Sequence, residues 1–276
     1  MRILLPGTLE EALQMLAATP DATPMAGGTD LLVHWPQHPE LHERSYVDLS
    51  GLEELRPHRW TDDEFVLGGL TSYWDVITDR RAGVELPLLI EAGRQVGAVQ
   101  IQTRGTWAGN IANGSPAADG VPVLMAYDAL VVLQSTRGRS EVPLAEFYVG
   151  YKEMRRKPDE LITQIRLPRR EYDLQIFEKV GSRQAQAITK VGVAITHSAA
   201  GWRVVSNSMA PFVCRCPSLE RLLEDGRPVS SPDDLLPAIR EDVSPIDDIR
   251  STAEYRERVM AKVLYYDLLD VCPSFS

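Results

Sequence analysis

The order of the elements predicted from the sequence indicates an α+β protein. At the N-terminus, a short strand at 3–5 precedes a helix that begins at Thr8, where Glu11 completes a capping box. In the last third of the chain, three strand-like runs lie together between 175 and 206, and three helical patterns follow them. Strands and helices therefore do not alternate regularly, which argues against a parallel βαβ fold.

The middle of the chain carries further strand patterns and two helical ones. We expect Thr71 to cap a helix that continues through Ile77, and 86–99 has a helical apolar pattern interrupted by glycines. The strand patterns lie at 46–49, 65–68, 129–133 and 161–167. The C-terminal helices are expected to start at Ser218, near Ser231 and at Thr252. The last of them places on one face the residues Tyr255, Val259, Val263, Tyr266 and Leu269.

A polar segment at 168–173, PRREYD, lies between two predicted strands and marks a candidate domain boundary. We expect a first domain at 1–168 and a C-terminal domain at 169–276, the latter with a three-stranded antiparallel sheet and helices.

Composition excludes several classes of protein. The net charge is −10 and no basic patch is evident, which argues against a nucleic-acid partner. No segment approaches ~20 uninterrupted apolar residues, so no transmembrane segment is expected. The first residues lack the apolar core and cleavage site of a secretory signal, so we expect a cytoplasmic protein.

Neither a metal site nor a catalytic side chain can be recognised. The three cysteines are too few for a four-thiolate iron–sulfur cluster, and the histidines lack the spacing of a helical pair. A G-x-G-x-x-G after the first strand and a G-x-S-x-G elbow are both missing. We therefore predict no metal ligands and no catalytic residues in this chain.

Two glycine-rich segments are candidates for ligand binding. AGGTD, residues Ala26 to Asp30, lies at a strand-to-helix junction, where Gly27 and Gly28 would let the backbone N–H groups approach a diphosphate. A plain tight turn explains the same residues.

The second segment is GTWAGNIANGSPAAD at 105–119, which is nearly uncharged and built of small residues. We expect a long loop whose amides line a polar, ring-shaped ligand, together with the side chains of Thr106, Asn110, Asn113 and Ser115. Asp119 would accept hydrogen bonds from ribose hydroxyls. A structural loop packed on itself is the alternative. Held together, the two segments could bind the two ends of one dinucleotide.

At these two segments the sequence resembles the FAD-binding medium subunits of the molybdenum hydroxylase family, of carbon monoxide dehydrogenase and xanthine dehydrogenase type. The family carries an AGGTDL turn and later an IRNxGTIGGNIxxxSPxAD loop, which appear here as AGGTDL and IQTRGTWAGNIANGSPAAD. The likeness continues in family order through DALVVL, VPLAEFYVGY, PDELITQIRLP, FEKVGSRQAQAI, MAPFVCR and DDIRSTAEYRERV.

The resemblance implies a vanillyl-oxidase-type FAD-binding domain of two α+β subdomains, at about 1–56 and 57–168, followed by the C-terminal α+β domain. It implies that Ala26, Gly27, Gly28, Thr29 and Asp30 cradle the FAD diphosphate. It also implies that Thr106, Gly109 and Asn110 lie along the flavin and its phosphates, and that Ser115 and Asp119 help to hold the diphosphate and ribose. Leu161 would form an apolar wall near the flavin, and Lys179 a polar or charged contact.

Two departures from the family pattern affect the expected site. Trp107 stands where the pattern has Ile or Leu, and Ala108 stands where it has Gly. Trp107 either stacks on the flavin ring or points into the core, and the sequence leaves both orientations open.

The function implied is that of an oxidoreductase subunit in a heterotrimer-type complex. A partner subunit would hold molybdopterin, and another would hold two-iron two-sulfur clusters. Electrons would pass from these clusters through FAD in this chain to an acceptor such as NAD. The alternatives are a self-sufficient FAD-dependent oxidase or reductase and a scaffold subunit without flavin.

Overall fold

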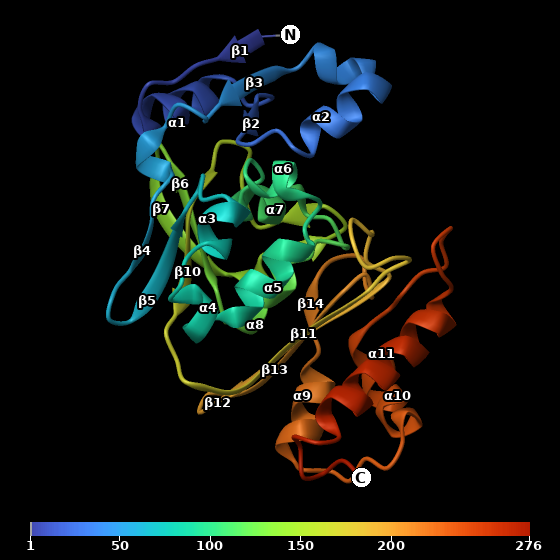
Figure 1. Ribbon diagram of the computed structural model, residues 1–276. Coiled ribbons are helices and arrows are strands. Elements are labelled where there is room, and N and C mark those ends of the chain that lie inside the picture. Colours follow the sequence, from blue (N-terminus) through green and yellow to red (C-terminus); the bar gives the residue numbers. More distant parts are fainter. Residues whose placement is uncertain (1) are drawn as a thin grey trace.

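The computed structural model describes residues 2–276, which form three main sheets in succession along the chain (Figure 1). The N-terminal sheet lies at one end of the molecule and the C-terminal helices lie at the other, with a larger sheet and its helices between them. The predicted α+β class is therefore confirmed.

The N-terminal sheet is parallel, with the strand order β1-β3-β2. Its elements are β1 (Arg2–Leu4), α1 (Leu9–Ala18), β2 (Thr23–Met25), α2 (Leu31–His34), η1 (Trp35–Gln37), η2 (Pro39–His42), β3 (Ser45–Asp48) and η3 (Glu53–Leu55). Helix α1 begins after Thr8, whose Oγ1 accepts a hydrogen bond from the Glu11 N–H. The predicted capping box is only half formed, because the Glu11 carboxylate accepts from the Gly7 N–H instead.

The middle sheet is antiparallel, with the order β4-β5-β10-β6-β7. Its strands are β4 (His58–Trp60), β5 (Glu64–Gly68), β6 (Leu130–Ser135), β7 (Gly138–Pro143) and β10 (Leu161–Pro168). The accompanying elements are α3 (Tyr73–Ile77), α4 (Ala82–Glu85), α5 (Pro87–Gln95), α6 (Val99–Gln102), α7 (Trp107–Asn113), α8 (Gly120–Ala126), η4 (Leu144–Glu146) and the hairpin β8 (Tyr148–Gly150) and β9 (Glu153–Met154).

The cap of α3 differs from the prediction. Ser72, not Thr71, caps this helix and forms a capping box with Asp75. Thr71 is fully buried, and its hydroxyl donates to the Arg56 carbonyl. Ser is the better N-cap of the two residue types, and the hydroxyl of Thr71 is occupied by its long-range bond to Arg56.

The C-terminal sheet has four antiparallel strands instead of the predicted three. Its strands are β11 (Tyr172–Val180), β12 (Val191–Ser198), β13 (Gly201–Asn207) and β14 (Cys214–Arg215). The helices that follow are α9 (Pro217–Glu224), η5 (Pro232–Leu235), α10 (Leu236–Asp242) and α11 (Ala253–Leu268). The fourth strand has only two residues, too few for a pattern of alternating burial to reveal it.

The two faces of this sheet pack against different parts of the molecule. Because side chains alternate across a strand, Val193 and Ile195 of β12 join the core beneath the C-terminal helices, whereas Ala194 between them joins the core of the middle region. Strands β12 and β13 contact α8 on that second side.

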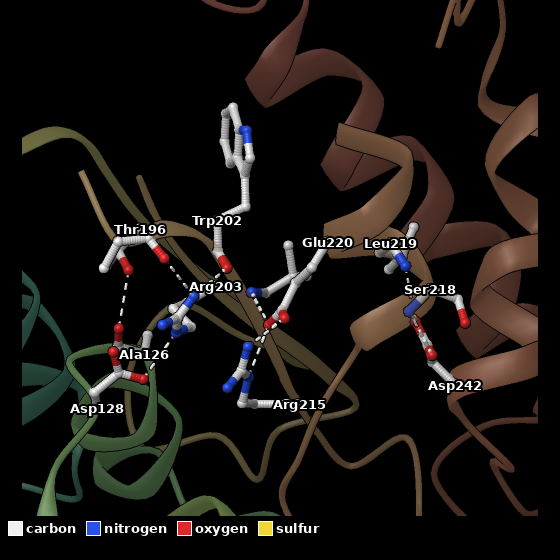
Figure 2. Close-up of polar contacts among 12 residues, drawn as sticks. Ala126, Asp128, Thr196, Trp202, Arg203, Arg215, Ser218, Leu219, Glu220 and Asp242 are labelled. Carbon is white, nitrogen blue, oxygen red and sulfur yellow. Dashed lines mark hydrogen bonds and ion pairs between the residues drawn. The ribbon is translucent and has the colours of Figure 1, made fainter. Parts of the chain in front are cut away.

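Polar contacts strengthen the same interface (Figure 2). The Thr196 hydroxyl donates to the Ala126 carbonyl at 2.9 Å, and Arg203 Nε donates to Asp128 Oδ1 at 2.8 Å. The chain therefore passes the predicted boundary near 168 while the hydrophobic core continues across it.

Candidate cofactor-binding site

A cavity of about 530 Å³ lies where three segments distant in the sequence meet. The first is the turn between β2 and α2, the second is α6 to α7, and the third runs from the β8–β9 hairpin to the start of β10. Its lining includes Ala26, Gly27, Gly28, Thr29, Asp30, Tyr73, Thr106, Ala108, Gly109, Asn110, Asn113, Lys152, Met154, Arg156, Leu161 and Ile162.

The turn at 26–31 offers backbone donors to this cavity. Gly28 adopts φ +70°, a left-handed conformation that favours glycine. Within residues 2–276, the backbone N–H groups of 27–31 donate no hydrogen bond to the protein. Such unpaired N–H groups attract an anion such as a diphosphate.

Gly27 allows two parts of the site to touch. A Cβ on Gly27 would lie 1.8 Å from the Arg104 carbonyl oxygen, so this position has no room for a side chain. At the other end of the turn, Asn113 Nδ2 donates to Asp30 Oδ1 at 3.1 Å. The two glycine-rich segments predicted from the sequence therefore lie side by side.

The second segment is partly helical, so the predicted long loop at 105–119 is wrong. Residues Trp107–Asn113 form α7, and Thr106 caps it by accepting from the Gly109 N–H at 2.9 Å. Gly114 ends the helix in the left-handed conformation. Small residues at helical spacing suit a helix that must approach other backbone closely, and the sequence did not distinguish this from a loop.

An apolar surface faces the same cavity. Leu161 and Ile162, at the start of β10, line it and are 5% exposed. Met154 lines it as well, from β9. Leu161 therefore lies where an apolar wall was expected, and the cavity combines backbone donors with an apolar surface, the two features that a diphosphate and a flat ring system require.

Tyr73 and Asn110 bring buried polar atoms without protein partners to the cavity. The hydroxyl of Tyr73 and Oδ1 of Asn110 are both buried and form no hydrogen bond with any group of residues 2–276. Burial raises the pKa of the Tyr73 hydroxyl well above its ordinary value, and the charge of Asp119 raises it further, so the hydroxyl stays protonated. Unsatisfied polar atoms beside a cavity fit a site that is completed by a ligand.

Trp107 takes the second of its two expected orientations. Its side chain is fully buried in the core, with its ring centroid 4.7 Å from that of Tyr73. A Cβ on Gly120 would lie 3.2 Å from the indole, so the lack of a side chain at Gly120 makes room for it. Ala108, in contrast, lines the cavity.

Asp119 and Lys179 form an ion pair behind the cavity and do not line it. Lys179 Nζ lies 2.7 Å from Asp119 Oδ2, and Thr189 Oγ1 donates to Asp119 Oδ1 at 2.5 Å. Burial raises the pKa of Asp119 despite the opposing effect of Lys179. Lys179 lies in β11 and Thr189 lies just before β12, so these contacts join the C-terminal sheet to the end of the second glycine-rich segment.

Ser115 also lies outside the lining, and its Oγ accepts from the Ala117 N–H at 3.3 Å. Sequence reasoning missed Tyr73, Lys152 and Arg156, which line the cavity from other segments. No local pattern marks them, because only the fold brings them to the site.

A second cavity of about 620 Å³ lies between the β12–β13 turn and α9. Two of its four charged residues, Arg203 and Glu220, pair with Asp128 and Arg215 (Figure 2). A third, Arg221, pairs with Glu241 on the surface. Within residues 2–276 no group of three or more His, Cys, Asp or Glu side chains could hold a metal ion.

Comparison with known proteins identifies the family. Residues 1–170 match the FAD binding domain in molybdopterin dehydrogenase, and residues 177–271 match the CO dehydrogenase flavoprotein C-terminal domain. The chain belongs to the FAD-binding medium subunits of the molybdenum hydroxylases. The predicted family and its cofactor FAD are therefore confirmed, and this FAD subunit is part of an oxidoreductase.

Several relatives cover nearly the whole chain. The xanthine dehydrogenase FAD-binding subunit of Escherichia coli O157:H7 is 28% identical over 258 residues, which are 90% of this chain and 88% of the relative. The caffeine dehydrogenase subunit beta of Pseudomonas sp. (strain CBB1) is 30% identical over 273 residues, which cover 94% and 90%.

A solved structure shares the fold of this medium subunit. Carbon monoxide dehydrogenase from Hydrogenophaga pseudoflava, in a form that lacks the Mo-pyranopterin moiety, superimposes with a TM-score of 0.85 at 25% identity. The match covers 99% of this chain and 96% of that one. Separately, no helix within residues 2–276 is both long and apolar enough to cross a membrane.

Proposed function

We propose that this FAD subunit passes electrons from the two-iron two-sulfur clusters of a partner subunit to an acceptor such as NAD. A further partner would hold molybdopterin and oxidise the substrate. Bound FAD supplies the redox chemistry, and this chain binds it, orients it and shields it from water. The relatives are named as FAD subunits, medium chains or lettered subunits of dehydrogenases, which supports a heterotrimer-type complex. A cytoplasmic location is part of the proposal.

The observation that carries the proposal is the meeting of backbone donors and an apolar wall in one cavity. We assign the diphosphate to Ala26, Gly27, Gly28, Thr29 and Asp30, whose turn offers unpaired N–H groups. Thr106, Gly109 and Asn110 would lie along the rest of the cofactor, and Leu161 would pack against its ring.

Four of the residues expected at the cofactor would act from behind the cavity. Trp107 supports α7 from the core, and Asp119 and Lys179 hold the C-terminal domain against the site. Ser115 stabilises the turn after α7. These positions agree with a boundary near 168, and we propose an FAD-binding domain at 1–168 and a C-terminal domain at 169–276. Within the FAD-binding domain we propose subdomains at about 1–56 and 57–168.

The absorption spectrum of the purified chain tests the proposal first. We expect the visible bands of an oxidised flavin and the release of FAD on denaturation. A folded chain that stays colourless after incubation with FAD and its co-purifying partners would instead support the scaffold alternative.

Purification of the tagged chain from its native host tests the partners. We expect two further subunits to co-purify, with molybdenum and iron detected in the complex. Recovery of a lone chain that turns over a simple donor by itself would contradict the electron-transfer proposal and favour a self-sufficient oxidase or reductase.

A further inference from the structure

The cavity is lined by an arginine that has no acidic partner. Arg156 belongs to the lining and is half-buried. Its Nη1 donates to the Glu160 carbonyl oxygen at 2.6 Å, whereas its Nε is buried and forms no hydrogen bond. Within residues 2–276, no ion pair with N and O atoms up to 4.0 Å apart includes Arg156.

The carboxylates nearest in sequence are bound elsewhere. Asp159 and Glu160 both pair with Arg137, which lies on the exposed side of the turn. Glu160 Oε2 also accepts from the Lys157 N–H at 2.8 Å. The two carboxylates of the turn at 157–160 are therefore engaged by Arg137 and by the Lys157 N–H, and neither forms an ion pair with the guanidinium of Arg156 beside the cavity.

An unpaired guanidinium in such a place is unfavourable. Burial lowers the pKa of Arg156, and the charges of Glu160 and Asp159 compensate for this only in part. Charges that are removed from water in proteins are normally paired, because the loss of hydration is unfavourable. The missing counter-charge is thus expected to come from whatever fills the cavity.

The other charged side chains of the cavity do not meet this need. Asp30 accepts from Asn113 and lies 4.0 Å from His34, and it is exposed. Lys152 is itself a cation, and it extends the positive region along the β8–β9 hairpin. The cavity therefore presents two cations near an apolar wall, an arrangement suited to an anionic dinucleotide with a flat ring.

We propose that Arg156 binds the negative charge of the FAD in this cavity and is a cofactor-binding residue of this subunit. The inference rests on the proposed function, since it assigns FAD to this cavity. A guanidinium offers several N–H donors in a planar fork, which suits either the diphosphate or the carbonyl edge of the ring as it gains negative charge on reduction. Both sources share one chemistry, an oxygen anion.

The test measures the dissociation constant of FAD and its midpoint potential in the full chain. Arg156→Met removes the charge and keeps much of the stem, and Arg156→Lys keeps the charge without the fork. The matched control is Arg155→Met, because Arg155 is exposed and pairs with Glu146 on the surface. We expect Arg156→Met to weaken FAD binding by about tenfold to a hundredfold, Arg156→Lys to be intermediate, and the control to match the wild type.

The two forms of the cofactor distinguish the sources of the anion. Equal loss of affinity for oxidised and reduced FAD would assign Arg156 to the diphosphate. A loss confined to reduced FAD would assign it to the ring, with the midpoint potential about 30 mV lower per tenfold loss.

Unchanged affinity and potential in a folded Arg156→Met protein would overturn the inference while leaving FAD binding intact. If the methionine variant does not fold, as judged by circular dichroism, the lysine variant decides. An intermediate loss of FAD affinity in Arg156→Lys supports the assignment, and affinity and potential equal to those of the wild type contradict it. A wild-type chain that binds no FAD would refute the proposed function instead.

Discussion

At the scale of single residues, Gly27 lets two segments separated by almost eighty positions come into contact. The Arg104 carbonyl oxygen occupies the place where any other residue would carry its Cβ. The same contact leaves the neighbouring N–H groups of the turn free to face the cavity. A missing side chain is therefore part of the cofactor site.

We expect Gly27→Ala to weaken FAD binding at least tenfold and to lower the free energy of unfolding by roughly 1–3 kcal/mol, because the added methyl group forces the two backbones apart. FAD titration and urea unfolding measure these effects. Gly83→Ala is the control, since a Cβ there meets nothing within 4 Å. Equal FAD affinity in the two variants would show that the close approach is not needed for binding.

A local pattern in the sequence singles out some of the residues that line the cavity. The AGGTD turn stands out because adjacent glycines have a recognisable conformational use, and all five of its residues line the cavity. Tyr73 and Arg156 line it as well, yet nothing next to them in the sequence marks them. Their roles depend on burial and on missing partners, which are properties of the folded chain.

At the scale of elements, the apolar face predicted for α11 and the residues just beyond it is only partly correct. Val259, Val263 and Leu269 pack against the core as expected, whereas Tyr255 and Tyr266 are 42% and 63% exposed. The residues buried on this helix are Arg256, Met260, Ala261, Leu264, Tyr265 and Leu268. Apolar residues occur around much of the helix, so the packing partners, not the pattern, choose the face.

We expect Leu264→Ala to lower the free energy of unfolding by about 2–5 kcal/mol, because it leaves a cavity in the core beneath the C-terminal helices. Tyr266→Ala should change it by no more than about 0.5 kcal/mol. Urea unfolding of both variants measures the difference. A larger loss of stability in Tyr266→Ala than in Leu264→Ala would instead support the apolar face predicted from the sequence.

Asp267, on the same helix, should make the free energy of unfolding depend on pH. Burial and the charge of Glu178 raise the pKa of Asp267 to about 6, and its Oδ2 is buried without a hydrogen bond. The folded protein thus binds this proton more tightly than the unfolded chain. The stability contributed by the protonated group is present below about pH 4 and is lost as the pH rises through about 6.

Asp267→Asn should therefore be more stable than the wild type at pH 7.5 and equally stable at pH 4. Denaturant unfolding at the two pH values measures the difference. Asp270→Asn, at an exposed position nearby, is the control for removing one negative charge. A stability difference that is the same at both pH values would exclude the titration of Asp267 as its cause.

At the scale of the whole molecule, the C-terminal sheet is held against the FAD-binding region by shared core and by buried charge. Ala194 packs into the middle core, and Lys179 reaches back to Asp119 at the start of α8. This explains why a residue of the C-terminal domain can resemble a cofactor contact in the family pattern and still not line the cavity.

We expect Lys179→Met to lower the free energy of unfolding by about 3–5 kcal/mol, because it leaves Asp119 buried without its partner. The double variant with Asp119→Asn should recover part of that loss. Arg221→Met, which breaks an exposed pair with Glu241, should cost at most about 1 kcal/mol. Because the pair lies behind the cavity, the FAD affinity of the folded Lys179→Met protein should change by less than about threefold. A tenfold loss of FAD affinity would instead favour direct contact between Lys179 and the flavin.

The sequence by itself determined the α+β class, most strand positions and the two glycine-rich segments, because alternation, caps and adjacent glycines are local signals. Only the tertiary structure decided that 105–119 contains a helix at Trp107–Asn113, that Trp107 points into the core, and that Asp119 and Lys179 pair with each other. It also placed Arg156 at the cavity without an acidic partner. These outcomes depend on which distant groups compete for the same space or charge, and that competition exists only once the chain has folded.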